Sequence, residues 1–438
     1  FTIIYNIIIK LFNSNKQGEK MRKRIILSVF LVLLFVFLLI SCSSEDNSNK
    51  KKIVYWSMWN EVEPQGQVIK EAIKDFMKKH NDIVVEVTWN GREIRKTLQP
   101  ALDNNQSIDL WDEDLERTIR NWGQYALALD DYVSKSYDNT DGKPYKDVVM
   151  NSLLELSKTY SEDGKIYAIP YQPFTFLIMY NKEHFNKAGI TKTPETWAEF
   201  KDACAKLKAA GFIPLTVDDA YVDILYGYQL ARYKGSDWVK KLVLEGLWND
   251  TTVLKAAKDW EEMCKLGYFS PNVAGNKFPQ GQQEIANGEV SMYLNGTWLV
   301  NEVMPTTGPD FPWGQFAYPT VQGGVGKLYD LNYGGQSFQI NKNSKYPDEV
   351  FNLIVHLTTG QWDKELAEKT YGVPMANTTD WPIQLTDAKD IFPKLGICYP
   401  WAAGLQYNTD KAPVIASAFT KLITGQITSE QFVAEVKK

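Results

Sequence analysis

Three adjacent carboxylates, Asp112, Glu113 and Asp114, follow directly after a β-rich run. A pair of carboxylates that flanks a sugar can supply the acid and the base of glycoside hydrolysis. Neighbouring residues at a strand end point apart, however, and acids are favoured at the start of a helix. We therefore expect this cluster to accept hydrogen bonds from a polar ligand or to cap a helix, and we disfavour catalysis.

Tryptophan is the second residue type that suggests a site, because the chain holds 14 of them and is 13% aromatic. Those at predicted strand or helix positions are explained by packing: Trp89, Trp197, Trp238, Trp260 and Trp362. Others lie in predicted loops beside or near Gly, Pro or acids: Trp59, Trp111, Trp298, Trp313 and Trp401. A sugar ring has an apolar C–H face and a rim of hydroxyls, so a Trp platform beside carboxylates and amides suits it.

The sequence lacks the motifs of several common catalytic, cofactor-binding and metal-binding sites. There is no P-loop, no GxGxxG fingerprint and no GxSxG elbow. Cys204, Cys264 and Cys398 show no CxxC spacing, and the three histidines show no HExxH spacing, so we expect neither a metal site nor a cofactor. Of 48 basic and 53 acidic residues, six basic and one acidic precede Cys42, which leaves the remainder with a net charge of about −10. Such a body should repel nucleic acid.

The first part of the chain resembles a targeting segment. Met21–Arg24 is basic, and Ser28 is the only polar residue in the run from Ile25 to Ile40, which is shorter than the ~20 residues of a membrane-spanning helix. We therefore predict a signal peptide over residues 21–41.

The run ends at Leu39-Ile40-Ser41-Cys42, which resembles a bacterial lipobox and predicts lipidation of Cys42, although Ile40 and Ser41 fit loosely. An ordinary secreted protein or an uncleaved anchor remains the alternative. Residues 42–52 are then a tether, since no apolar residue follows Cys42 in this stretch. Residues 1–20 fit no targeting class, and we expect them to be an untranslated leader.

The body begins with the alternation of a βαβαβ unit, whose strands should be parallel. The predicted strands are 53–57, 83–89 and 108–111, and the predicted helices are 68–77 and 93–104. Ligands bind at the carboxyl ends of such strands. The same alternation continues with predicted strands at 165–170, 176–180, 213–216, 290–294 and 337–340 and helices at 197–210, 223–233 and 252–266. Thr196 with Glu199, and Thr428 with Gln431, have the spacing of capping boxes.

Several motifs together resemble one family. They are Gly164-Lys165-Ile166-Tyr167-Ala168-Ile169-Pro170, Tyr180-Asn181-Lys182, Thr196-Trp197, Asn287-Gly288-Glu289-Val290-Ser291-Met292, Gly296-Thr297-Trp298 and Gly372-Val373-Pro374. In combination they are similar to family 1 extracellular solute-binding proteins, the sugar-binding lipoproteins of bacterial ABC importers, with maltose-binding protein among their relatives. The resemblance covers essentially all of the chain after residue 52.

The resemblance implies an α/β, two-lobed, periplasmic-binding-protein-like fold of type II, whose lobes close by hinge bending. Residues 53–168 and 295–340 would form lobe 1, and residues 169–294 and 341–438 would form lobe 2. The chain would cross between the lobes near residues 168–170, 292–294 and 339–341.

The resemblance also implies a cleft. Trp298 matches the ligand-stacking aromatic of the family, and Trp111 and Asp114 match its sugar-contacting Trp and acid. The full set of candidate ligand-binding residues is Trp56, Trp59, Glu61, Trp111, Asp112, Glu113, Asp114, Tyr171, Gln172, Phe174, Trp298 and Trp401. The stretch 109–114 is unusually acidic and lacks the usual Pro-Asp, so the ligand can differ from maltose.

We therefore expect a monomeric, non-enzymatic carbohydrate receptor of an ABC importer, lipid-anchored at the extracytoplasmic face of a bacterial membrane and delivering its ligand to the permease. A receptor for another polar solute, such as a polyol, a phosphodiester, a peptide or a cation, is the first alternative. A surface glycoside hydrolase or lyase is the second, and it would need two separated carboxylates that face one cleft.

Overall fold

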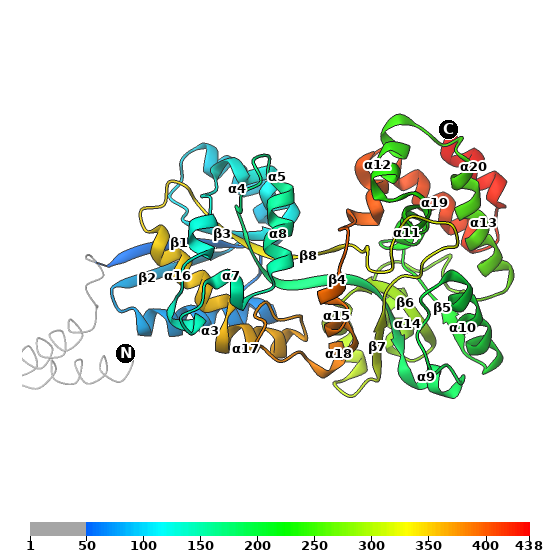
Figure 1. Ribbon diagram of the computed structural model, residues 1–438, viewed down its shortest axis with the longest axis horizontal. Coiled ribbons are helices and arrows are strands. Elements are labelled where there is room, and N and C mark those ends of the chain that lie inside the picture. Colours follow the sequence, from blue (N-terminus) through cyan, green and yellow to red (C-terminus); the bar gives the residue numbers. More distant parts are fainter. Residues whose placement is uncertain (1–49) are drawn as a thin grey trace, which may run out of the picture. The chain divides into compact units, whose positions relative to one another are not determined.

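The computed structural model describes residues 50–438, so the predicted leader, the signal peptide and Cys42 lie outside the described residues. A single eight-stranded sheet runs through the described chain in the order β2-β1-β3-β8-β4-β6-β5, and β7 pairs with β4 (Figure 1). The strands are β1 (Lys51–Ser57), β2 (Ile83–Trp89), β3 (Leu110–Asp114), β4 (Ile169–Asn181), β5 (Ile213–Leu215), β6 (Val290–Gly296), β7 (Trp313–Phe316) and β8 (Tyr333–Ile340).

The predicted βαβαβ unit is present, because β1 pairs in parallel with both β2 and β3. Its third strand begins and ends later than expected. The acids Asp112 and Glu113 therefore lie inside β3 rather than after it, opposite Phe338 and Ser337 of the antiparallel strand β8. Pairing with β8 on one side and with β1 on the other covers this strand and extends it beyond Trp111.

Strands β4 and β8 join the two halves of the sheet. Two separate strands were predicted at 165–170 and 176–180, but the structure has the single strand β4. The first half of β4 pairs antiparallel with β8, from Ile169 opposite Phe338 to Thr175 opposite Tyr333. Its second half pairs antiparallel with β6 and β7. The register shifts between Tyr171 and Pro173, where Gln172 adopts a left-handed φ of 47°.

The buried side chains form two hydrophobic clusters, here called the first core and the second core. The first core contains residues from the range 53–171 and from 333–375. Its helices are α3 (Pro64–Lys79), α4 (Ile94–Asp103), α5 (Leu115–Trp122), α6 (Asp130–Val133), α7 (Tyr145–Val148), α8 (Asn151–Tyr160), α16 (Pro347–Thr358) and α17 (Gly360–Thr370).

The second core contains residues from 176–331 and from 373–436. Its helices are α9 (Lys182–Lys187), α10 (Trp197–Ala209), α11 (Val222–Lys234), α12 (Ser236–Glu245), α13 (Thr251–Lys265), α14 (Gln280–Ala286), α15 (Leu299–Thr307), α18 (Thr386–Lys389), α19 (Ala412–Ile423) and α20 (Ser429–Lys437). Both predicted capping boxes are formed, at the starts of α10 and α20. Within residues 50–438, no helix combines the length and the apolar character that crossing a membrane requires.

Hydrophobic packing divides the chain at points that differ from the expected lobe boundaries. Residues 299–317 pack in the second core, and α16 and α17 pack in the first. A crossing between the lobes was expected near residues 292–294. These residues belong to β6, which pairs with β4 and β5 and does not cross between the cores. After β4, the next crossing is made by β8, which pairs with β3 and with β4.

One buried guanidinium organises a long loop of the second core. Arg232, at the end of α11, has no exposed surface. It donates hydrogen bonds of 2.6–3.1 Å to the carbonyl oxygens of Tyr318, Pro319, Lys327, Leu328 and Asp330 and to the hydroxyl of Tyr399. The planar fork of arginine can satisfy several acceptors at once. Arg232 therefore holds both the loop that precedes β8 and the segment around Tyr399.

Replacing Arg232 with Met should destabilise the protein by at least ~3 kcal/mol, because each buried acceptor left without a donor costs ~1–3 kcal/mol. Urea denaturation followed by circular dichroism measures this loss. Arg117→Met is the matched control, since the Arg117 side chain is 43% exposed and its loss should change the unfolding free energy little. Equal stability of the two variants would contradict the role given to Arg232.

Candidate ligand-binding site

A cavity of about 630 Å³ lies where the two cores and strand β8 meet. Its lining comes from α5 and its neighbours, from β8 and from aromatic residues of the second core. The lining residues are Arg95, Asp114, Leu115, Glu116, Arg117, Arg120, Asn121, Tyr160, Phe174, Trp298, Asn332, Tyr333, Gly334, Gln336, Trp401 and Gln406. Of the predicted site residues, the structure brings four together here: Asp114, Phe174, Trp298 and Trp401.

Trp298 stands between strand β6 and helix α15. Its indole ring folds back over the end of β6, where a Cβ atom on Gly296 would come within 2.4 Å of the ring. Glycine at this position therefore makes room for the indole ring of Trp298 itself. The rings of Phe174 and Phe176 meet Trp298 edge to face, at centroid distances of 4.9 and 5.0 Å. These contacts fix the plane of the indole.

Trp401 begins the irregular helix η7 (Trp401–Tyr407), whose next three residues are all left-handed. Ala402 and Ala403 have φ values of 47° and 54°, and Gly404 has 104°. Non-glycine residues rarely adopt this conformation, and such strain persists only where the surroundings impose it. Here α11 approaches closely, since a Cβ atom on Gly227 would lie 2.0 Å from the carbonyl oxygen of Ala402. The strained turn and the glycine together hold Trp401 at the cavity.

The two indoles are almost parallel. Their planes differ by 4° and their ring centroids are 6.5 Å apart. Phe176 stands at right angles to both, with centroid distances of 5.0 Å to Trp298 and 5.2 Å to Trp401. Both tryptophans are only partly buried, as cavity-lining residues must be. The second core thus contributes a rigid aromatic surface built from residues about one hundred positions apart.

Two polar residues at β8, absent from the predicted set, face the same cavity. The side-chain oxygens of Asn332 and Gln336 are buried and have no partner in the described protein. Asn332 cannot reorient freely, because its amide group donates to the carbonyl of Tyr399 at 2.6 Å and its backbone N–H donates to the hydroxyl of Tyr228 at 2.7 Å. A buried acceptor without a donor is costly. A ligand that donates hydrogen bonds would relieve this cost.

The glycines close to these two residues are the sequence feature that could have indicated them. The pair Gly334-Gly335 stands between them, at the end of a Gly-rich stretch that precedes the predicted strand 337–340. A Cβ atom on Gly335 would lie 3.0 Å from the carbonyl oxygen of Tyr171. The glycines thus permit β8 to lie close against β4, with an amide side chain on either side of them.

The charges that surround the cavity are balanced. Arg95 donates two hydrogen bonds to Glu113, of 2.8 and 3.0 Å, and Arg120 pairs with Glu116 at 2.8 Å. Arg117 lies 4.0 Å from Glu113. Each arginine therefore has a carboxylate nearby, and neither sign of charge dominates.

Asp114 has the capping role that the sequence offered as one alternative. Its carboxylate accepts a hydrogen bond of 3.0 Å from the backbone N–H of Arg117 at the start of α5. Burial raises the pKa of Asp114 to about 6. Because Asp114 also lines the cavity, capping does not prevent it from contacting a ligand.

The other two acids and their tryptophan neighbour lie away from the cavity, in the first core. Trp111, Asp112 and Glu113 have no exposed surface. The indole N–H of Trp111 donates to the side chains of Gln339, at 2.8 Å, and Thr118, at 3.2 Å. These three residues do not line the cavity, because β3 continues past them and β8 pairs with it along this stretch.

Asp112 is the centre of a buried hydrogen-bond network. It accepts from the backbone N–H of Met58, at 2.9 Å, and from the hydroxyl of Tyr171, which in turn accepts from the indole N–H of Trp59 at 2.7 Å. Burial raises the pKa of Asp112 to about 6, although these hydrogen bonds act in the opposite direction. The network ties the loop after β1 to β3 and to the crossing strand β4.

The remaining predicted site residues also lie outside the cavity lining. Trp56 is a buried residue of β1, and Tyr171 and Trp59 belong to the network of Asp112. Glu61 forms an exposed ion pair with Lys70. Gln172 donates to the hydroxyl of Thr370 at 2.9 Å.

Two further tryptophans that were expected in loops lie in the hydrophobic cores. Trp313, expected in a loop, is a buried residue of β7, and Trp59 is buried as well. Trp197 and Trp260 are buried as predicted, whereas Trp89, Trp238 and Trp362 are partly buried at the edges of the two cores: Trp238 packs against the second, and Trp89 and Trp362 pack against the first. Among residues 50–438, no group of His, Cys, Asp and Glu side chains is arranged to hold a metal ion.

Comparison with known proteins gives consistent matches. The profile of bacterial extracellular solute-binding proteins matches residues 60–364. A putative binding protein of Brucella abortus (strain 2308) is 28% identical over 244 residues, which are 52% of this chain and 58% of the relative, so the match spans less than two thirds of that relative. The galactooligosaccharide-binding protein of Bacillus subtilis (strain 168) is 23% identical over 360 residues, which are 79% of this chain and 80% of the relative.

Solved structures show the same fold. A probable secreted solute-binding lipoprotein from Streptomyces coelicolor superimposes with a TM-score of 0.70 at 15% identity, over 89% of this chain and 98% of the other. This likeness confirms the predicted α/β fold of two-lobed solute-binding proteins of the maltose-binding type.

Asp112→Asn should change how stability depends on pH. A carboxyl whose pKa is about 6 when folded keeps its proton where the unfolded chain, with an ordinary pKa near ~4, has released it. The unfolding free energy of the wild type should therefore fall relative to that of the variant as pH rises from ~4 to ~6, by up to about 3 kcal/mol. Urea titrations across this pH range measure the difference. Asp131→Asn, at an exposed acid of α6, should keep the wild-type slope. Equal slopes for the wild type and Asp112→Asn would contradict the prediction.

Proposed function

The chain belongs to the family of bacterial extracellular solute-binding proteins, and from this membership we propose that it is the substrate receptor of an ABC importer that binds a carbohydrate in the cavity. The receptor would hold its ligand between the two cores and deliver it, chemically unchanged, to the transmembrane subunits of a permease. No cofactor is needed for this task.

One observation carries the proposal: a rigid aromatic surface faces buried, unpartnered hydrogen-bond acceptors across one cavity. The parallel rings of Trp298 and Trp401 suit the apolar face of a sugar ring. The side-chain oxygens of Asn332 and Gln336 would accept hydrogen bonds from its hydroxyls. A purely apolar ligand would leave these oxygens unsatisfied.

The charge balance supports a neutral ligand. Arg95 pairs with Glu113 and Arg120 with Glu116, and Arg117 lies 4.0 Å from Glu113, so an ionic ligand would meet no excess of opposite charge at the cavity. A phosphodiester or a cationic solute is therefore disfavoured relative to a sugar. A relative that spans 79% of this chain is named for galactooligosaccharide binding, which agrees with this choice.

The geometry gives no support to a glycoside hydrolase. Asp114 and Glu116 are the carboxylates in the cavity lining, and Glu116 is paired with Arg120, so the lining offers no second free carboxylate beside Asp114. Hydrolysis needs one carboxyl group to act as an acid and a second to act as a base or nucleophile on the same bond. The family to which the chain belongs consists of binding proteins.

Trp298→Ala should abolish most of the affinity for sugar while the fold persists. Thermal-shift screening over monosaccharides and oligosaccharides identifies a ligand, since one present at ~100 times its Kd adds ~2.7 kcal/mol to stability. Calorimetry then compares the affinities of wild type and variant.

Trp238→Ala is the matched control, because Trp238 is also partly buried but lies outside the cavity, beside Lys234. It should bind as the wild type does. A Trp298→Ala variant that melts far lower yet binds normally per folded molecule would show that Trp298 serves the core alone. A screen in which other polar solutes bind and sugars do not would replace carbohydrate as the ligand.

We also propose that residues 21–41 are a signal peptide and that Cys42 carries the lipid that anchors the receptor outside the cytoplasmic membrane. The observation behind this is the lipobox-like end of the apolar run at Cys42 and the polar stretch that follows it. The family description as extracellular agrees with this location.

Cys42→Ser should move the protein from the membrane fraction to the soluble fraction, because the described body has no helix that could hold it in a membrane. Fractionation and immunoblotting of expressing cells measure the shift. Intact-mass analysis that finds an unmodified N-terminus downstream of Cys42 in the wild type would contradict the proposal.

A further inference from the structure

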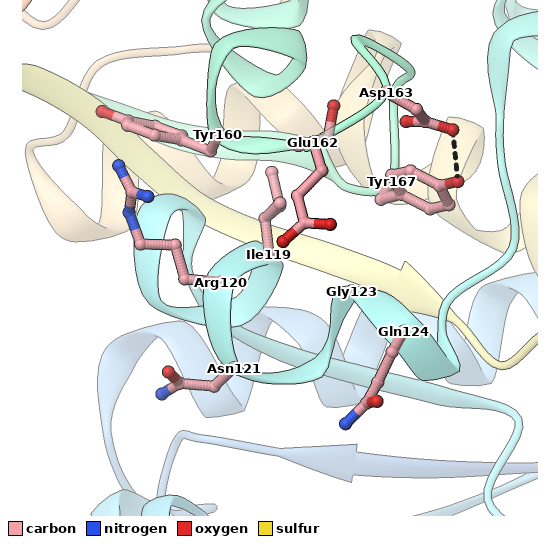
Figure 2. A pocket seen from close by; sticks show the side chains of 10 residues that line it. Ile119, Arg120, Asn121, Gly123, Gln124, Tyr160, Glu162, Asp163 and Tyr167 are labelled. Atoms are coloured by element: carbon pink, nitrogen blue, oxygen red, sulfur yellow. Dashed lines mark hydrogen bonds between the residues drawn. The ribbon is translucent and has the colours of Figure 1, made fainter.

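A second hollow, of about 620 Å³, lies on the first core beside the cavity. It is enclosed by the end of α5, the short helix η3 (Gly123–Tyr125) and the loop that follows α8 (Figure 2). Its lining residues are Ile119, Arg120, Asn121, Gly123, Gln124, Tyr160, Ser161, Glu162, Asp163 and Tyr167. Nothing in the function proposed above uses this hollow.

The two hollows adjoin each other. Arg120, Asn121 and Tyr160 line both of them. The guanidinium of Arg120 lies over the ring of Tyr160, 5.4 Å from its centroid, and it pairs with Glu116 on the cavity side. The Arg120 side chain is 51% exposed. Side chains, and not backbone, therefore separate the two hollows, and the long side chain of Arg120 among them is half exposed.

The second hollow gathers polar groups that the protein itself does not use. The side chains of Asn121, Gln124 and Glu162 make no hydrogen bond or ion pair with any other residue in the range 50–438. In Figure 2 the Glu162 side chain extends from the loop after α8 toward α5. On the far side, the hydroxyl of Tyr167 donates to Asp163 at 3.0 Å. Amides, a carboxylate and tyrosine rings are the groups that bind sugar hydroxyls and sugar C–H faces.

We propose that the second hollow binds the distal units of a neutral oligosaccharide whose first units lie against Trp298 and Trp401. This inference rests on the proposed function and adds the length of the ligand to it. Each hollow has the volume of an ordinary small-molecule site, so the pair suits a ligand longer than either one could enclose. The oligosaccharide passes between them over Arg120 and Tyr160. Glu162 and Asp163 disfavour an anionic sugar at the distal end.

The test measures affinity against chain length. Calorimetry on the whole mature protein uses disaccharides through hexasaccharides of the galacto-, malto- and chito-oligosaccharide series. Wild-type affinity should rise with length in the series that binds. The double variant Gln124→Ala/Glu162→Ala should bind the longest member about tenfold more weakly, a loss that two hydrogen bonds to hydroxyls account for, and the disaccharide as tightly as the wild type does. Both positions are exposed, so the fold should be unaffected.

Glu155→Ala serves as the control, since Glu155 is an exposed acid of α8 that lines neither hollow, and it should change no affinity. If the double variant binds every length as the wild type does, or loses affinity equally for all lengths, the second hollow is not a subsite and the proposed function stands. If no sugar of any length binds to the wild type, the proposed function fails, and the inference fails with it.

Discussion

The antiparallel pairing of β4 with β8 is the constraint on which the rest of the structure depends. These two strands carry the chain between the first and the second core, and each is held by further strands on its other side. Gly334 and Gly335 allow the close approach, because a Cβ atom on Gly334 would lie 3.1 Å from the Phe174 ring and one on Gly335 would lie 3.0 Å from the carbonyl oxygen of Tyr171. The same pairing sets Asn332 and Gln336 at the floor of the cavity. The same structural element therefore connects the two cores and contributes to the lining of the cavity proposed to bind the ligand.

The two sides of the cavity are lined by different kinds of side chains. The second core supplies aromatic rings that are locked by edge-to-face contacts and by a strained turn at Ala402 and Ala403. The first core supplies charged side chains of α5, of which Arg120 pairs with Glu116 and Arg117 lies 4.0 Å from Glu113 of β3. A rigid apolar platform opposite adjustable polar groups suits a ligand with one apolar face and a hydroxyl rim, since pre-organised surfaces lose little entropy on binding.

The acids Asp112, Glu113 and Asp114 are adjacent in the sequence and suggest one site, but each has a different role in the fold. Asp112 accepts hydrogen bonds from Met58 and Tyr171, Glu113 binds Arg95, and Asp114 caps α5. Buried carboxylates need such partners, because an unpaired buried charge is costly. Of the three, Asp114 alone reaches the cavity. The body is acidic overall, yet the acids around the cavity are matched by arginines, so net charge says little about the ligand.

The sequence by itself determined the α/β alternation, the parallel β1, β2 and β3 and the two capping boxes, because periodicity and caps are local properties. It also singled out Trp298 and Trp401 as candidate aromatics, and both line the cavity. Only the tertiary structure decided which acids reach the cavity, that 165–180 holds one strand beginning at Ile169, and that α16 and α17 belong to the first core. Asn332 and Gln336, too, could be identified as cavity residues only from the tertiary structure. Burial, strand pairing and the absence of a hydrogen-bond partner depend on residues far away in the sequence, and no local pattern records them.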